Sequence, residues 1–129
     1  MVQFNRPQSL AEVARVGDDV EAFSFALRNF LDEFYANPEA RRIEEEPRFL
    51  VSTLNDEGLA DAYLGGVAEH LALRQRIPVP AWTRTARRRL GKPWFSMNSH
   101  GGRMFLLVES PAAFRERNIF ISADALSRA

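Results

Sequence analysis

Two histidines are the first candidates for chemistry, because imidazole is the commonest general acid–base group in enzymes. His70 lies beside the apolar residues of a long predicted helix and has no His, Asp or Glu three or four residues further on with which to bind a metal. His100 precedes two glycines and Arg103, a stretch that could form a small anion-binding concavity or a flexible connection. Paired with Glu69 or Glu109, either histidine could serve a small enzyme of unknown reaction. We favour a core-edge histidine at position 70 and a flexible connection at position 100.

The glutamates Glu44, Glu45 and Glu46 are the densest group of carboxylates. Adjacent residues of a helix point about 100° apart, so these side chains do not converge on a metal ion, and a solvated acidic surface is the better interpretation. The chain has no cysteine, which excludes thiol nucleophiles, disulfides and cysteine zinc sites. It also lacks the phosphate-loop, dinucleotide, GxSxG and HExxH patterns. We therefore predict no catalytic residue, no metal site and no cofactor.

One short segment concentrates positive charge. If it is helical, Arg84, Arg87 and Arg88 share a face, with Gly91 as the stop. The segment suits phosphate contacts, docking onto an acidic protein surface, or simple solvation. It is the candidate binding patch, and its five cations within nine residues are Arg84, Arg87, Arg88, Arg89 and Lys92.

The formal net charge of zero conceals two unlike halves. Residues 1–64 hold 13 carboxylates and 6 arginines, whereas residues 65–129 hold 4 carboxylates and 11 basic residues. One interpretation is that the halves fold against each other and partly neutralise. The other is an acidic face and a basic face, the latter meeting an anionic partner.

Helical periodicity dominates the N-terminal half. Ser9 can cap a short helix over residues 10–16, which Gly17 ends. Asp18 and Glu21 have capping-box spacing at the start of the next helix, and Asn37-Pro38 closes it. A third short helix follows over residues 38–45, and one or two helical turns come after Pro47. The buried stripe of the second helix has the i, i+3, i+4 pattern in Val20, Phe23, Ala26, Leu27, Phe30, Leu31 and Phe34.

The stretch from Asn55 to Trp82 predicts a long helix followed by a proline-rich link. We place Asp61 and Glu69 on its polar side, away from the apolar face. Gly65-Gly66 weakens the helix, so either close approach of another helix or a kink is expected there. Pro78 and Pro80 end the helix, and Trp82 is expected to fold back onto the core.

The C-terminal part is harder to interpret. Residues 93–103 indicate a loop, and the apolar run 104–109 fits either a helix or a buried strand, of which we favour the helix. Ser110-Pro111 can begin another helix over 112–117, and Ser122 a last one over 123–128. Residues 118–121 are β-prone.

These elements predict an all-α fold. Residues 1–129 form one compact domain, a bundle of about five to seven helices, with residues 1–8 as a flexible N-terminus and at most a minor strand near Ile119–Ile121. The ten phenylalanines indicate a core rich in that residue. The N-terminus lacks the apolar region of a signal peptide, and the longest strongly apolar run, Met104–Val108, is too short to span a membrane. We expect a soluble cytoplasmic protein with no membrane partner.

Two motifs resemble a family of short bacterial proteins that has no assigned activity. They are Pro78-Val79-Pro80-Ala81-Trp82-Thr83, and the stretch from Glu109 to Ser122 that reads ESPxxFRxRNIFIS, with the ending Leu126-Ser127-Arg128-Ala129. Members of that family sit beside nucleotidyltransferase-like or other toxin-like genes and are treated as antitoxin-like or regulatory partners. The resemblance covers about a quarter of the chain. It implies a non-enzymatic protein whose partner is a neighbouring gene product, and it carries over no site residues.

Three functional hypotheses follow. The first is a helical module that binds a partner protein, in an antitoxin-like or regulatory role. The second is a DNA-binding regulator that contacts phosphates through the basic segment, although a sequence pI near 6.7 is low for such a domain. The third is the small enzyme using His70 or His100. The sequence leaves the oligomeric state open.

Overall fold

The computed structural model describes residues 6–126, and within them seven α-helices and two short strands are formed. Two 3-10 turns, η1 (Ala81–Arg84) and η2 (Ala86–Arg88), follow the fifth helix, and the strands are β1 (Trp94–Phe95) and β2 (Ile119–Phe120). The all-α fold with five to seven helices is confirmed, as is the minor strand near Ile119–Ile121. The helices are α1 (Leu10–Val16), α2 (Val20–Ala36), α3 (Arg41–Glu44), α4 (Val51–Leu54), α5 (Leu59–Gln75), α6 (His100–Glu109) and α7 (Ala112–Arg115).

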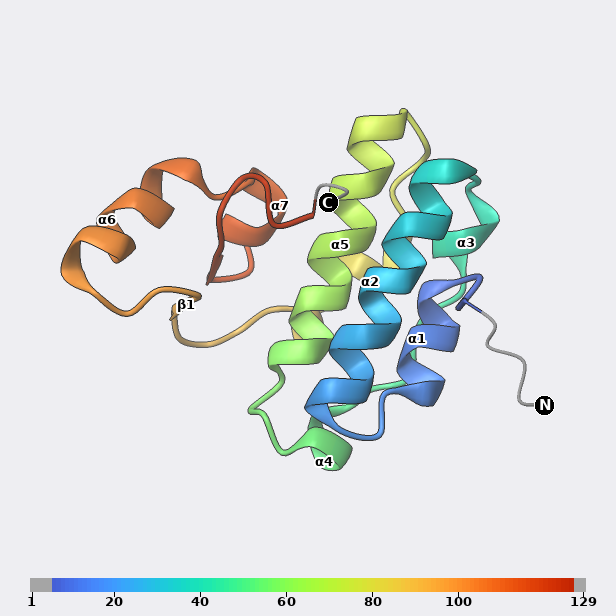
Figure 1. Cartoon of the computed structure of the whole chain (residues 1–129), viewed down its shortest axis with the longest axis horizontal. Helices are drawn as coiled ribbons and strands as arrows, with labels where there is room; N and C mark the ends of the chain where they lie inside the picture. The colour runs from blue at the N-terminus through green and yellow to red at the C-terminus, as the bar shows by residue number, and fades with distance from the viewer. Residues whose placement is uncertain (1–5, 127–129) are drawn as a thin grey trace.

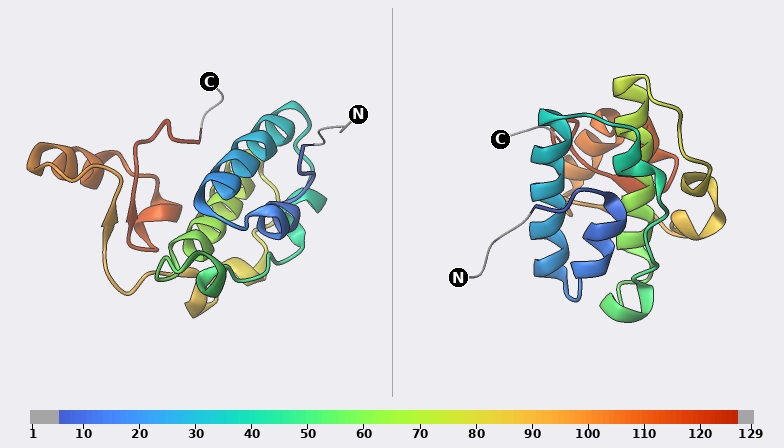
Figure 2. Two further views of the ribbon diagram at one scale, coloured as in Figure 1. Left: turned by 60° about the horizontal axis from the view of Figure 1, so that its bottom comes forward. Right: turned by 90° about the vertical axis from the view of Figure 1, so that its right-hand side faces the viewer.

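A helical body contains most of the chain. The two long helices α2 and α5 run side by side in it, and α1 packs against α2 (Figures 1 and 2). On its other side α5 contacts α7 and both 3-10 turns. Because α5 is covered on two sides, most of its circumference is buried rather than a single stripe.

Phenylalanine fills much of the core, as predicted. Phe30, Phe34 and Phe114 are fully buried. The rings of Phe30 and Phe34 lie 5.9 Å apart, and that of Phe114 lies 5.1 Å from Tyr63. Each such side chain stabilises the fold by roughly 2 kcal/mol through burial. Phe114 links α7 to α5.

Side-chain caps decide where the helices begin. Ser9 accepts a hydrogen bond from the Glu12 N–H, which confirms the predicted start of α1. Helix α2 is capped by Asp19, one residue after the predicted Asp18, because Asp19 accepts from the Ala22 N–H at 2.7 Å. The long helix α5 begins at Leu59 rather than near Asn55, because Asp56 accepts from the N–H groups of Gly58 and Ala60.

The double glycine of α5 permits close packing, which confirms the first of the two explanations. A Cβ on Gly66 would lie 2.7 Å from the Phe114 ring, and one on Gly65 would lie 3.0 Å from Arg117 Nε and 3.1 Å from Arg88 Cβ. Real Cβ atoms essentially never lie within 3.0 Å of such neighbours, and the distances at Gly65 are tighter than most real Cβ contacts. The pair of glycines therefore lets α7 and η2 sit against the α5 backbone.

The proline-rich link folds back as expected. Trp82 is buried, and its indole Nε1 donates to the Ile43 carbonyl at 3.1 Å. This bond ties the link after α5 to α3.

The remaining segment leaves the body. Strands β1 and β2 pair in parallel with Trp94 opposite Ile119, and the Phe95 and Phe120 rings stack 4.7 Å apart. Residues 92–109, which contain β1 and α6 and are called the arm below, project from the body (Figure 1).

Two C-terminal expectations are corrected. The predicted loop over residues 93–103 contains β1 and the first turn of α6, because Ser99 caps the helix by accepting from the Gly102 N–H at 3.0 Å. Residues 123–126 form a turn instead of a helix, and residues 127–128 of that prediction lie outside the described part. Among the helices described, none has both the length and the apolar character needed to cross a membrane.

Candidate functional site

The basic segment folds as the two 3-10 turns, not as a helix. Arg88 is fully buried, so the prediction that it contributes to a surface patch is wrong. Arg87 lies over the Phe49 ring, 3.6 Å from its centroid, which fixes its guanidinium against the body. The remaining exposed cations of the patch are Arg84, Arg89 and Lys92.

Arg88 joins the two unlike halves of the chain. Its Nη2 lies 3.2 Å from Glu46 and its Nη1 lies 3.9 Å from Asp61. It also donates to the backbone carbonyls of Pro47 and Asp61. The acidic and basic halves thus fold against each other and partly neutralise at this point, as the first interpretation of the charge split expects.

A second buried arginine holds the C-terminal segment to α5. Arg117 Nη1 donates to Glu69 at 2.6 Å and to the Ala113 carbonyl at 2.7 Å, and Nη2 donates to Thr83. The expectation that Asp61 and Glu69 lie on a solvated face is therefore wrong. They are 2% and 8% exposed, because α7 and η2 cover the side of α5 that carries them.

Burial controls the ionisation of this interior. It raises the pKa of Asp61, against the opposing effects of the Leu50 N–H at 2.6 Å and of Arg88. Burial likewise lowers the pKa of Arg88, although its bonds to Glu46 oppose that change. The guanidinium remains charged at neutral pH because its ordinary pKa is so high. These arginines have partners within the chain and serve the fold.

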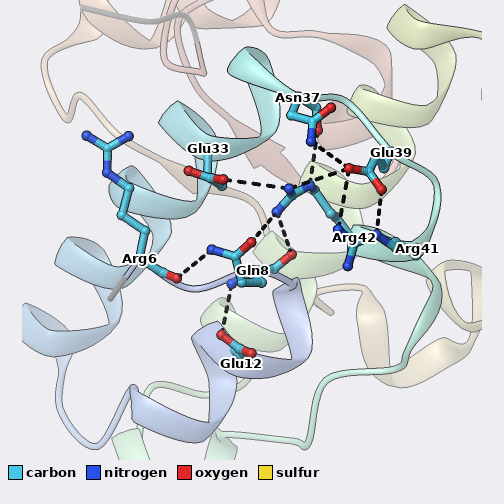
Figure 3. A network of polar contacts seen from close by, with 8 residues as sticks. All are labelled: Arg6, Gln8, Glu12, Glu33, Asn37, Glu39, Arg41 and Arg42. Carbon is cyan, nitrogen blue, oxygen red and sulfur yellow. Dashed lines mark hydrogen bonds and ion pairs between the residues drawn. The ribbon is translucent and has the colours of Figure 1, made fainter. Parts of the chain in front are cut away.

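A third buried arginine organises the N-terminal region (Figure 3). Arg42 is 2% exposed, and its Nη1 donates to the backbone and side-chain oxygens of Gln8 at 3.2 and 2.9 Å. Its Nε donates to the Asn37 carbonyl, and its Nη2 lies 3.6 Å from both Glu33 and Glu39. The network joins the segment before α1 to the end of α2 and to α3.

The histidines are not placed beside the carboxylates that the enzyme hypothesis requires. His70 is half-buried with its ring 6.2 Å from Phe114, and burial lowers its pKa, with Arg74 acting in the same direction. Its neighbour Glu69 binds Arg117 instead. His100 and Glu109 are the first and last residues of α6, about 14 Å apart along the axis.

The three consecutive glutamates face outward, as predicted. Glu45 lies 3.6 Å from Arg15, and Glu46 pairs with Arg88. Within residues 6–126, no three His, Cys, Asp or Glu side chains gather closely enough to hold a metal ion.

The arm carries a surface that sequence reasoning missed. Five apolar residues follow one another in α6, and of these only Leu106 is buried. Val108 is 78% and Met104 54% exposed. At about 100° per residue these two lie on the side opposite Leu106, with Phe105 and Leu107 flanking them. This exposed set, called the apolar arm face below, also includes two residues of the strand and turn before α6, and its members are Trp94, Met97, Met104, Phe105, Leu107 and Val108.

The sequence does hold a signal for this surface. One buried stripe takes three to four apolar residues in every two turns of helix, spaced three or four apart, whereas the five apolar residues of α6 are consecutive and so surround the helix. The favoured helix is confirmed, but α6 packs closely only against β2, so the body covers one side of it.

An apolar groove begins at the foot of the arm. It has a volume of about 490 Å³ and lies between α2, the first turns of α5 and the C-terminal turn, with Trp94 at its edge. Its walls include Leu27, Leu31 and Tyr63, and its two charged lining residues are Arg28 and Asp56.

Comparisons of the chain with protein-family models, with curated proteins and with solved structures find no match.

Proposed function

We propose that this chain is a non-catalytic protein-binding module whose binding surface is the apolar arm face. An antitoxin-like or regulatory role, in which the chain covers a surface of a neighbouring gene product, is the form of this function that the sequence resemblance implies. The single observation that supports the proposal is the gathering of six exposed large apolar side chains on one projecting segment.

The size of this surface is what distinguishes it from scattered apolar exposure. Trp94 is 37% exposed, the least of the six, and Val108 is the most exposed. Together they present roughly 600 Å² if each contributes about 100 Å², which is about half of what an aromatic side chain buries when fully covered. An exposed apolar area of about 600 Å² is at the upper end of the largest patches found on monomers, and patches of that size are often functional.

DNA binding, the alternative, is less favoured by the same geometry. Readers of the major groove present basic side chains on a helix. Helix α2 carries Glu21, Asp32 and Glu33 against one arginine, α5 is covered on two sides, and the exposed residues of α6 are mainly apolar. The alternative predicts a mobility shift of duplex DNA at low salt that weakens when the exposed residues Arg84 and Arg89 are changed to Ala.

Site-specific photocrosslinking tests the proposal. A photoreactive residue replaces Val108 on the arm, or Leu73 on α5 as the control, because Leu73 is also apolar and 61% exposed but lies on the body. The chain is expressed at its native level in its own host. We expect a discrete protein adduct from position 108 and none from position 73. The absence of adducts at both positions, or equal adducts, would refute the arm as the binding surface.

A further inference from the structure

We infer that the partner seated on the apolar arm face is a second copy of this chain, with the α6 helix of each copy docked in the groove of the other. The inference rests on the proposed function that the arm face binds protein, and it assigns that face to a second copy of the chain in place of the neighbouring gene product that the sequence resemblance implies. Three features of the described residues support it, namely the arm face, the groove volume and the position of the groove beside the arm.

The arm face is suited to enter a groove. Met104, Leu107 and Val108 have the i, i+3, i+4 spacing of helix-in-groove ligands, and all three are exposed on a helix that packs closely only against β2. Ser99 caps the helix before docking, so little ordering remains to oppose association.

The groove is large enough to hold the apolar side chains of the arm helix. Its volume of about 490 Å³ accommodates about three apolar side chains, since a cavity of about 150 Å³ holds one benzene ring. Its walls are the exposed edges of Leu59 and Tyr63, together with Val20, which is 61% exposed. An apolar helix face and an apolar groove are thus both uncovered on the same chain.

The charged residues of the two surfaces do not oppose docking. The arm carries Lys92 and Arg103 against one carboxylate, Glu109. The two charged residues that line the groove, Arg28 and Asp56, have opposite signs. A groove without net charge therefore accepts this arm without electrostatic repulsion.

The positions of the arm and the groove allow a closed two-fold dimer. Trp94 belongs to the arm and also lines the groove, so the two surfaces adjoin. A two-fold axis between them can place each arm in the other groove, which gives an isologous dimer with no free copy of either surface. The two arm faces together expose about 1,200 Å² that docking can cover, and the groove walls add to this area, so the available surface reaches the range of stable interfaces.

Analytical ultracentrifugation of the full chain tests the inference. We expect the wild-type chain to be a dimer at micromolar concentration. We call the contact of one arm with the groove of the other copy a junction. Val108→Lys on the arm and Val20→Glu in the groove each place a charge in a junction that buries valine in the wild-type dimer. Each change should therefore raise the dimer dissociation constant by about tenfold or more. Leu73→Glu is the matched control, since Leu73 has the same 61% exposed fraction as Val20 and should leave the dimer intact.

Mixing the two weakened variants provides the sharper test. Val108→Lys retains a normal groove and Val20→Glu a normal arm, so a mixed dimer regains one intact junction and should associate more tightly than either variant alone. Circular dichroism must show native helix content in each variant. In an alternative dimer the two arms contact each other and the grooves stay empty. Such a dimer would be weakened by Val108→Lys but not by Val20→Glu, and this pattern of results would overturn the inference.

The inference would also be overturned if the wild-type chain stayed monomeric at a concentration 100-fold above the micromolar concentration at which we expect the dimer. It would leave the proposed function standing if photocrosslinking at position 108 still gave an adduct with another protein. An adduct of twice the chain's own mass supports the inference, whereas no adduct of any kind rejects the proposed function itself.

Discussion

Replacing Gly66 by Ala should destabilise the protein, although alanine is the better helix former. Gly66 lies within α5, where the change by itself would contribute roughly 1 kcal/mol of helix stability. The new Cβ, however, would lie 2.7 and 2.8 Å from two ring carbons of Phe114. Overpacking of this kind costs about 1–3 kcal/mol.

The ring has little freedom to move away. Phe114 is fully buried, with Tyr63 5.1 Å and His70 6.2 Å from its centroid. We therefore take about 2–3 kcal/mol for the steric cost, which leaves a net loss of about 1–2 kcal/mol. For a chain of this size, that lowers the melting temperature by roughly 3–8 °C.

Urea unfolding followed by circular dichroism measures the change, and Gly101→Ala is the matched control. Gly101 also lies in a helix, but a Cβ there would meet nothing within 4 Å. The control should therefore be neutral or slightly stabilising. If Gly66→Ala were as stable as the control, the ring would be free to shift, and our explanation of the double glycine would fail.

Two further predictions concern the buried ionisable groups. Burial lowers the pKa of His70 below its ordinary value of 6.5. As the pH falls below 6.5, His70 therefore takes up a proton more readily in the unfolded chain than in the folded chain. The free energy of unfolding should therefore fall as pH drops from 6.5 toward the folded pKa of His70. Urea titrations at several pH values should show a smaller fall for His70→Gln than for the wild-type chain, and an equal fall for the two proteins would contradict this explanation. Glu69→Ala should cost about 3 kcal/mol, because it leaves the Arg117 guanidinium buried without its carboxylate. The exposed Glu109→Ala is the comparison in thermal unfolding, and a Glu69 variant as stable as this one would show that the ion pair contributes nothing.

The arginines of this chain divide into two kinds, and this division bears on the function. Arg42, Arg88 and Arg117 are buried and bind carboxylates or carbonyls of the same chain. A partner therefore cannot use them, and the feature that most distinguishes the surface is the apolar arm face, not the density of positive charge. This is why we place the binding function on the arm and treat the exposed cations as secondary.

The helical elements of the body could be predicted from local sequence. The apolar spacing of residues 20–34 determines the buried stripe of α2, and Ser9 and Gly17 determine both ends of α1. Trp82 after two prolines indicated the return of the link to the core, where it is found. These features depend on residues within one or two turns of each other, so no distant contact was needed to recognise them.

The candidate site depended on contacts between segments far apart in the chain. Asp61 and Glu69 lie on the side of the helix that the sequence pattern indicates as polar. Only the approach of η2 and α7 buries them with Arg88 and Arg117. Conversely, Met104 to Val108 has the composition of core, yet four of its five residues are exposed because α6 packs closely only against β2. Periodicity in the sequence determined which segments are helical, but burial depends on what covers each face. Tertiary structure alone decided that three arginines lie inside and an apolar helix lies outside.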